Sequence, residues 1–415
     1  MRNVRFMNFM SIGLLCVMTP VLASAQSLTT LFTFNQIDGN DPGTLLLGAN
    51  GNLYGTMRQD GAELGGSIFE MTTTGQVVQG YYFNGFDPAG GEFPNGGLVQ
   101  APYGDFYGTT AGGGTGGNGG GTVFKIAERQ VITLYNFCSK SGCADGAYPY
   151  VGLTAAGNGN FYGTTNQGGR SCKFTDNGCG TIFEITPAGA LTTLYRFCSR
   201  EDCSDGYFPS GPLVEGRDGN FYGTTIFGGH GCEGSGCGTV FKITPAGELT
   251  TLYQFCSEAK CADGQFPYAG LVRASDGNFL GGADQGGIVE GCPVNSFGCG
   301  TIFRITPSGK FTTLHTFCAL KNCADGGAPS APLLQGTNGK IYGTASFGGA
   351  NGYGDVFEIT TEGQFTVLYS FCSQENCADG VTPASGLLES KGLLYGTTSG
   401  YGNQTPGTVF SLSLE

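Results

Sequence analysis

One tripeptide, Tyr-Gly-Thr, recurs along almost the whole chain. Successive copies begin 53 to 62 residues apart, and the degenerate copy Leu280-Gly281-Gly282 fills the one gap in the series. The six intact copies begin at Tyr54, Tyr107, Tyr162, Tyr222, Tyr342 and Tyr395. Such a regular period is the signature of a repeat architecture, in which each unit packs mainly against its neighbours. The chain therefore contains seven copies of one structural unit.

Each unit divides into four short apolar runs. In residues 211–255 the runs are GPLVEG, NFYGTT, GTVFKIT and LTTLYQF, separated by two tight turns and one long glycine-rich loop. β-branched and aromatic runs joined in this way are typical of an antiparallel meander. One meander cannot bury both of its faces, whereas seven around an axis pack face to face. We therefore predict an all-β fold, a seven-bladed β-propeller of four-stranded antiparallel blades, ahead of a parallel β-solenoid, whose coils are usually shorter.

The two ends of the repeat region complement each other. Residues 28–34, LTTLFTF, copy the fourth run of a unit, and residues 407–411, GTVFS, copy the third. The N-terminal strand is therefore predicted to complete the last blade and to close the ring without an unpaired strand edge.

The string DGNFYGTT…GTVFKITPAGELTTLYQF closely resembles the Gloeo/Verruco (GloVer) repeat of secreted bacterial proteins. More distantly, it is similar to the NHL and streptogramin-lyase-like propellers. The resemblance covers essentially all of residues 28–413. It implies the propeller fold and carries no particular activity with it.

Composition narrows the class of protein further. Glycine supplies 77 of 415 residues, and charged residues make up 12%. These values argue against a helical bundle, while 40% hydrophobic residues are enough for a large core. The formal net charge of −13 makes nucleic acid an unfavourable partner.

The first 25 residues have the pattern of a signal peptide. Arg2 and Arg5 precede an apolar run, and the small residues Ala23-Ser24-Ala25 follow it. A membrane anchor is the alternative, but the run is shorter than the roughly 20 residues that span a bilayer. We predict cleavage after Ala25 and one domain over residues 26–415, secreted or periplasmic, monomeric and without a membrane span.

The cysteines fall into regularly spaced pairs. Removal of Cys16 with the signal peptide leaves 16 of the 17 cysteines. Five pairs follow the pattern C-x4-C: Cys138/Cys143, Cys198/Cys203, Cys256/Cys261, Cys318/Cys323 and Cys372/Cys377. Three more pairs lie in separate loops: Cys172/Cys179, Cys232/Cys237 and Cys292/Cys299. An even number of cysteines in an exported protein predicts a disulfide within each pair, and the lack of nearby histidines disfavours zinc.

Both long connections of each unit are expected on one rim of the propeller, which selects that rim as the working face. The loop before the first strand carries Asp-Gly-x-x-Pro in six units, and Gly90 takes the aspartate's place in the second. The six aspartates are Asp38, Asp145, Asp205, Asp263, Asp325 and Asp379. A ring of carboxylates is a candidate calcium site, but Asp-Gly is also a common turn, which we prefer for a residue present in nearly every blade.

A single active site on a pseudo-symmetric ring is expected where one blade differs from the others. The fifth unit replaces Tyr-Gly-Thr-Thr-x by Leu-Gly-Gly-Ala-Asp, so Asp284 and Glu290 of the following loop are candidate acids or bases. Drift of the repeat is the preferred explanation of this difference. His230 is a further candidate in the long loop of the fourth unit, whereas His315 replaces an outer-strand tyrosine and is interpreted as a packing residue.

Aromatic side chains in the loops before the first strands are the candidate ligand-binding residues. Tyr148, Tyr150 and Tyr268 could stack on sugars, although local packing explains them equally well. Arg58 and Asn166 stand at the variable position that follows Tyr-Gly-Thr-x and add polar groups to the same rim.

The leading hypothesis is therefore a disulfide-stapled propeller that acts as a binding or scaffold module, with a carbohydrate or an exported protein as ligand. The competing hypothesis is an extracellular lyase or hydrolase that works at the mouth of the central channel. No cofactor is expected apart from calcium, and we favour the non-enzymatic hypothesis.

Overall fold

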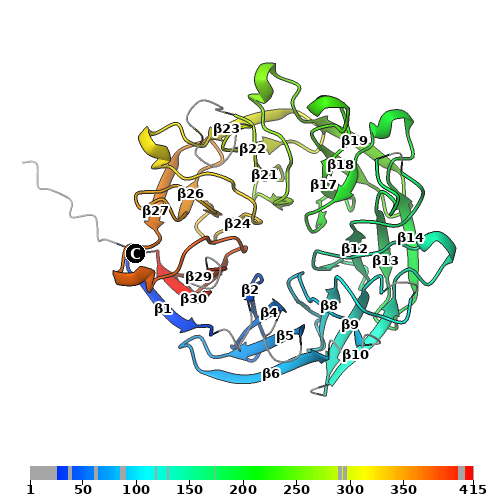
Figure 1. The fold of residues 1–415 in the computed structure, drawn as a ribbon, viewed down its shortest axis with the longest axis horizontal. Helices are drawn as coiled ribbons and strands as arrows, with labels where there is room; N and C mark the ends of the chain where they lie inside the picture. The colour runs from blue at the N-terminus through cyan, green and yellow to red at the C-terminus, as the bar shows by residue number, and fades with distance from the viewer. Residues whose placement is uncertain are drawn as a thin grey trace, which may run out of the picture.

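The protein is a ring of seven antiparallel sheets around a central axis (Figure 1). The structure is a computed structural model that describes residues 26–35, 40–59, 64–84, 90–116, 119–128, 130–172, 174–287, 292, 297–400 and 407–414. The predicted signal peptide, Asp38 and Glu290 lie outside the described residues. The all-β, seven-bladed fold predicted from the repeats is confirmed.

The strands of each blade run from the axis outward in chain order. Blade 1 contains β2 (Asn40–Pro42), β3 (Leu46–Leu47), β4 (Leu53–Gln59), β5 (Leu64–Met71) and β6 (Val77–Asn84). Blade 2 contains β7 (Val99–Gln100), β8 (Phe106–Thr110), β9 (Thr122–Ala127) and β10 (Gln130–Asn136). Blade 3 contains β11 (Thr154–Ala155), β12 (Phe161–Thr165), β13 (Thr181–Ile185) and β14 (Leu191–Arg196). Blade 4 contains β15 (Tyr207–Pro209), β16 (Val214–Glu215), β17 (Phe221–Phe227), β18 (Thr239–Ile243) and β19 (Leu249–Gln254).

The remaining blades follow the same order. Blade 5 contains β20 (Leu271–Arg273), β21 (Phe279–Ala283), β22 (Thr301–Ile305) and β23 (Phe311–Thr316). Blade 6 contains β24 (Leu334–Gln335), β25 (Ile341–Ala345), β26 (Asp355–Ile359) and β27 (Phe365–Ser370). Blade 7 contains β28 (Leu388–Ser390), β29 (Leu393–Thr398), β30 (Thr408–Ser413) and β1 (Leu28–Thr33).

The innermost strands are shorter than the predicted six-residue runs. In blade 4, Gly211 and Pro212 open the run GPLVEG, and only Val214–Glu215 pairs as a strand. Proline cannot donate to a β ladder and glycine weakens it, so pairing begins after them. In blades 1 and 4 a second short segment, β2 or β15, pairs with the other end of the same neighbouring strand.

The N-terminal strand closes the ring as predicted. β1 pairs antiparallel with β30, with Leu28 opposite Leu412 and Thr33 opposite Thr408. This pairing supplies the outer strand that blade 7 lacks and covers the edge of β30. The first and last described strands are thereby held in one sheet.

The Tyr-Gly-Thr motif joins neighbouring blades. Its tyrosine stacks on the first aromatic residue of the same strand in the next blade, and Tyr162 and Phe221 have ring centroids 4.0 Å apart. Its glycine lies under the phenylalanine of the third strand, where a Cβ atom on Gly163 would be 2.5 Å from the ring of Phe183. Its threonine bonds across the interface, and Thr109 Oγ1 donates to the carbonyl of Val151 at 2.9 Å. The conspicuous repeat therefore marks the packing between blades.

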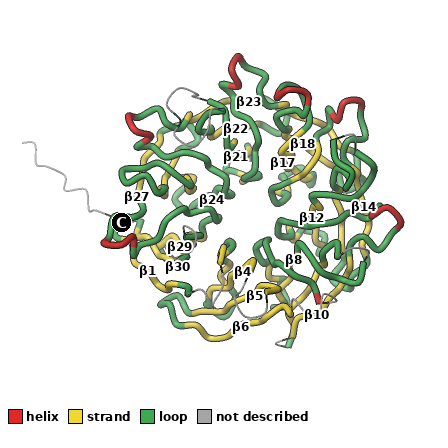
Figure 2. The backbone as a smooth tube through the Cα atoms, viewed as in Figure 1, coloured by secondary structure: helices red, strands yellow, loops and turns green. Residues whose placement is uncertain are grey.

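All eight predicted cysteine pairs are joined by disulfides. The C-x4-C loops contain the short 3₁₀ turns η2 (Ser141–Cys143), η3 (Glu201–Cys203), η5 (Ala259–Cys261), η6 (Lys321–Cys323) and η7 (Glu375–Cys377). A further turn, η4 (Cys232–Gly234), lies in the long loop of blade 4. The turns lie around the perimeter of the ring (Figure 2). This many disulfides is typical of proteins that fold in an oxidising compartment.

Within the described part of the chain, no helix has the length and apolar character required to cross a membrane.

Candidate functional site

Buried aspartates set the geometry of the five Asp-Gly-x-x-Pro loops whose aspartate the structure describes. Asp145 accepts hydrogen bonds from the backbone N–H of Ser139 at 3.0 Å, the hydroxyl of Ser139 at 2.7 Å and the hydroxyl of Tyr135 at 2.8 Å. Burial acts to raise the pKa of Asp145, but these hydrogen bonds outweigh it and hold the pKa below its ordinary value. Asp205, Asp263 and Asp379 accept equivalent bonds in their own blades.

These carboxylates face donors within their own loops, so the geometry supports the turn interpretation. Their bonds fold each C-x4-C loop back onto the outer strand of the same blade. Calcium at the aspartates stays a prediction, which chelation tests directly.

The two histidines have different surroundings. His315 stacks on Phe365 with ring centroids 3.8 Å apart, and its Nε2 lies 3.3 Å from a carboxylate oxygen of Asp325. It therefore takes the place that tyrosine occupies beside the aspartate in other blades. His230 is exposed, and no described carboxylate lies within salt-bridge distance of it.

The deviation in blade 5 has a packing explanation. A Cβ atom on Gly282, which replaces threonine, would lie 2.5 Å from the carbonyl oxygen of Pro329 in blade 6. Leu280 replaces tyrosine and belongs to one buried cluster with Ile341, which replaces the aromatic residue of the next blade. At this interface, aliphatic packing of Leu280 with Ile341 thus replaces the stacking of tyrosine on an aromatic ring, and the backbones of blades 5 and 6 lie closer together at Gly282. Such a compensated change agrees with drift of the repeat.

Asp284 follows these residues and is largely buried beside Tyr268. Burial raises the pKa of Asp284 to about 6, with a hydrogen bond from Gln285 opposing the rise. The charge of Asp284 and, to a larger extent, burial raise the pKa of Tyr268. Asp284 is the candidate carboxylate whose pKa is best suited to proton transfer near neutral pH.

The loops before the first strands meet at the mouth of the central channel. A cavity of about 560 Å³ lies there and receives residues from all seven blades. Each blade contributes the residue that follows the loop proline: Gly43, Asn95, Tyr150, Ser210, Tyr268, Ser330 and Ala384. The residue before the proline has a positive φ in six blades, for example 58° at Tyr148 and 57° at Phe208. The motif therefore turns the chain so that one residue per blade reaches the mouth.

Three of the predicted ligand-binding residues line this cavity. Arg58, Tyr150 and Tyr268 lie at the mouth, where the two tyrosines are 38% and 39% exposed. Ser210 Oγ donates to the carbonyls of Pro267 and Tyr268, each at 3.3 Å, which joins blades 4 and 5 beside Tyr268.

A second cavity of about 490 Å³ shares Arg58 and Tyr150 with the mouth and extends between blades 1, 2 and 3. Tyr148 lines it, as do Glu92 and Phe93, which the sequence did not single out. The signal that could have found them is their place in the loop motif, since Glu92 and Phe93 directly precede Pro94.

Asn166 lines neither of these cavities. Its backbone N–H donates to the carbonyl of Tyr148 at 3.0 Å, so this residue supports the loop that carries Tyr148. The structure thus brings four of the five predicted binding residues together and assigns the fifth to their support.

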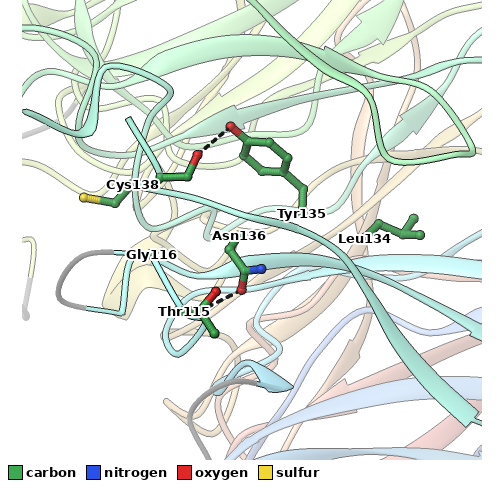
Figure 3. Close-up of a pocket in the computed structure, with 7 residues that line it drawn as sticks. Thr115, Gly116, Leu134, Tyr135, Asn136 and Cys138 are labelled. Atoms are coloured by element: carbon green, nitrogen blue, oxygen red, sulfur yellow. Dashed lines mark hydrogen bonds between the residues drawn. The ribbon is translucent and has the colours of Figure 1, made fainter. Parts of the chain in front are cut away.

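A third cavity, of about 430 Å³, opens on the outer side of the glycine-rich loop of blade 2 (Figure 3). There the N–H of Thr115 bonds to Asn136 at 2.9 Å, and the hydroxyls of Tyr135 and Ser139 are 3.1 Å apart (Figure 3). The same loop carries a second disulfide in blades 3, 4 and 5, which blade 2 lacks. Cavities therefore lie on both sides of this loop in blade 2.

The family model of the Gloeobacter/Verrucomicrobia repeat matches residues 13–175, 143–321 and 290–415. The chain belongs to this repeat family. The three matched segments extend over nearly all of the propeller, in agreement with the resemblance of the repeats. None of the curated proteins matches the chain significantly.

The chain is similar to several solved structures at low sequence identity. The extracellular domain of a hybrid two component system from B. thetaiotaomicron matches with a TM-score of 0.55 and 10% identity, over 94% of this chain and 39% of that chain. This chain thus spans well under half of that relative's length. A luciferin-regenerating enzyme matches with a TM-score of 0.46 and 10% identity over 94% and 95% of the two chains. The PQQ-bound aldose sugar dehydrogenase of Streptomyces coelicolor matches with a TM-score of 0.41 and 13% identity, over 94% of this chain and 98% of that chain.

Proposed function

We propose that this protein is an exported binding module that takes a carbohydrate at the mouth of its central channel. The observation that carries the proposal is the convergence of Arg58, Tyr150 and Tyr268 on one cavity of about 560 Å³. A volume between about 300 and 1,000 Å³ is typical of sites for small molecules.

The chemistry of the mouth suits a sugar. Tyr150 and Tyr268 offer partly exposed aromatic rings, against which the C–H face of a sugar ring can pack. Asn95, Ser210 and Ser330 supply amide and hydroxyl groups that can donate and accept hydrogen bonds with sugar hydroxyls. The blades hold these side chains on a rigid frame, which reduces the entropy lost on binding.

Export fits the covalent structure of the chain. Eight disulfides require an oxidising compartment, and the first 25 residues have the pattern of a secretory leader. Polysaccharides outside the cytoplasm are ligands that such a protein meets.

An extracellular hydrolase or lyase is the second candidate, and the raised pKa of Asp284 favours it. Acid and base catalysis on a sugar commonly uses a pair of carboxylates that converge on one bond. Among the described residues, Asp284 lines neither cavity, and Glu92 lines only the cavity between blades 1, 2 and 3. This separation favours binding over catalysis.

The proposal is tested by thermal unfolding of the oxidised protein against a panel of neutral and acidic oligosaccharides. A ligand of the native state raises the midpoint by mass action, so we expect a dose-dependent rise with at least one sugar. Tyr150→Ala and Tyr268→Ala should remove the rise. The control Tyr353→Ala alters a tyrosine that is 43% exposed and lines neither cavity, and it should keep the rise.

A rise that survives both mouth substitutions would contradict the site, and no rise with any sugar would contradict the ligand class. Release of reducing ends or of unsaturated products from the bound sugar, lost in Asp284→Asn, would establish the enzymatic alternative.

A further inference from the structure

The cavity between blades 1, 2 and 3 is lined by Gly112, a glycine at a position where five other blades carry a larger side chain. Gly112 pairs with Glu92 beside the glycine-rich loop. The residues at the same place in the other blades that show this pairing are Gln59, Gln167, Phe227, Gln285 and Phe347. A pocket formed in this way is a vacancy in the pseudo-sevenfold packing.

Blade 4 shows what the vacancy can hold. There Phe227 packs edge-to-face between Phe208 of its own blade, at 5.9 Å, and Phe266 of blade 5, at 5.4 Å. Phe93 and Tyr148 are the corresponding residues around Gly112, and both line the cavity. Blade 2 therefore keeps the two aromatic walls and lacks the ring that stands between them in blade 4.

The walls are held in place by backbone bonds. Glu92 and Gly112 exchange N–H to carbonyl bonds of 2.8 and 2.9 Å, and the N–H of Ala111 donates to the carbonyl of Phe93 at 2.9 Å. A ligand ring entering here meets a preformed slot, which lowers the entropic cost of binding.

Two charged side chains line the slot. Arg58 comes from blade 1 and Glu92 from blade 2, and Arg58 forms no salt bridge with any residue that the structure describes. A guanidinium binds a carboxylate through two parallel hydrogen bonds, and a carboxylate such as Glu92 accepts hydrogen bonds from hydroxyls.

We propose that this slot binds the ring of a uronic acid residue, so that the ligand at the mouth is an acidic oligosaccharide. The sugar ring takes the place that Phe227 fills in blade 4, its carboxylate pairs with Arg58, and its hydroxyls donate to Glu92. A neutral sugar in the slot would give Arg58 no counter-charge, and an aromatic ring would give Glu92 no hydrogen-bond donor. Both ligands would therefore bind less tightly than a uronic acid. The rest of the oligosaccharide passes Arg58 and Tyr150 into the mouth, because both residues line both cavities.

This inference rests on the proposed sugar-binding function and is tested by calorimetric titration with trigalacturonate and, as the neutral match, a galactose trisaccharide. We expect the acidic sugar to bind at least about tenfold more tightly, because a hydrogen-bonded charge pair contributes about that much. Arg58→Gln should make the two affinities equal within about threefold.

Gly112→Phe tests the place of binding. The φ of Gly112 is not in the left-handed region, and the nearest atom to an added Cβ is in the Phe93 side chain at 3.0 Å, so a side chain needs only a small adjustment. The variant should weaken trigalacturonate binding at least about tenfold, whereas Gly112→Ala, which leaves the slot open, should stay within about threefold of the wild type. Thermal midpoints without ligand verify that both variants fold, and Arg58→Gln tests the proposal independently.

Equal affinity of the wild type for the two sugars, or full affinity in Gly112→Phe, would overturn the proposal. If Tyr150→Ala still abolished binding in that case, the sugar-binding function would stand and the uronate slot would fall. Absence of binding to either sugar would remove both. Tighter binding of a peptide that ends in phenylalanine would assign the slot to a protein ligand and refute the sugar.

Discussion

Asp355 is a buried carboxyl group in a place where five of the other blades carry threonine and blade 1 carries Ser67. It begins β26, is fully buried, and accepts a hydrogen bond from Ser370 at 2.6 Å. Its second oxygen has no hydrogen-bond partner among the described residues. Burial raises the pKa of Asp355 from 3.8 to about 7, with the bond from Ser370 opposing the rise and the charge of Asp325 adding to it. At neutral pH and above, ionisation of this buried group lowers the free energy of unfolding.

The pH dependence follows from the sign of that change. Below pH 3.8 the carboxyl group is protonated in the folded and unfolded chains and costs nothing. Between pH 4 and 7 only the unfolded chain ionises, so the free energy of unfolding falls as the pH rises. Above about pH 7 the full cost is present, and a pKa raised from 3.8 to about 7 corresponds to roughly 4 kcal/mol.

The substitution Asp355→Thr should therefore stabilise the protein at pH 8. Blade 5 already shows the resulting pair, since Thr301 lies opposite Ala283 there just as position 355 lies opposite Ala345 in blade 6. Loss of the Ser370 bond removes about 1 kcal/mol. The expected gain is about 3 kcal/mol at pH 8, with no gain at pH 4.

Urea unfolding of the oxidised wild type and variant at five pH values from 4 to 8 measures this difference. Asp284 contributes a slope of the same sign to both proteins, so the difference between them isolates Asp355. The control Asp176→Thr removes an exposed carboxylate and should change stability by less than about 0.5 kcal/mol at every pH. A gain that does not depend on pH, or a loss at pH 8, would show that the buried charge of Asp355 does not destabilise the fold.

Three further outcomes follow from the loop geometry. The double substitution Cys198→Ser with Cys203→Ser should lower the free energy of unfolding by about 2 kcal/mol, the value for a disulfide that closes a short loop. If urea unfolding is unchanged, this disulfide does not stabilise the fold. His315→Tyr should raise stability by about 1 kcal/mol, because tyrosine donates a hydrogen bond to the loop aspartate in four other blades; a loss would show that the imidazole is preferred beside Asp325. Excess EDTA should leave the thermal midpoint within about 1 °C, because the buried aspartates are satisfied by N–H and O–H donors, and a fall of several degrees would establish a structural cation.

The sequence predicted most of the architecture because the architecture is repeated. Six intact copies of Tyr-Gly-Thr and one degenerate copy identified the number of blades, and the strand fragments at the two ends identified the closure of β1 on β30. The role of each residue within the motif could not be predicted from the sequence. The need for Gly163, for example, arises from the ring of Phe183 on the third strand, which lies where a Cβ atom would be.

The residues of the candidate site that occupy regular positions of the repeat could be predicted from the sequence. Features that arise where a blade departs from the repeat could not. Arg58 was found because it stands at a variable position of a regular rim, and Tyr150 and Tyr268 were found because they are aromatic residues in the loops before the first strands. The slot at Gly112 arises from an absent side chain, and its walls come from two blades, so no single motif marks it. Asp355 was missed because the sequence does not show that this position, threonine in most other blades, is fully buried.

The central claim is that the mouth of the channel binds a sugar through its two exposed tyrosines. Isothermal titration of the oxidised protein with the oligosaccharide that gives the largest thermal shift tests it most directly, with the double variant Tyr150→Ala, Tyr268→Ala titrated in parallel. We expect saturable one-to-one binding by the wild type and at least about a tenfold loss in the double variant, because two aromatic contacts of about 0.5 to 1.5 kcal/mol each together reach the roughly 1.4 kcal/mol that a tenfold change requires. Unchanged affinity in a folded double variant would show that the sugar does not bind through these two tyrosines.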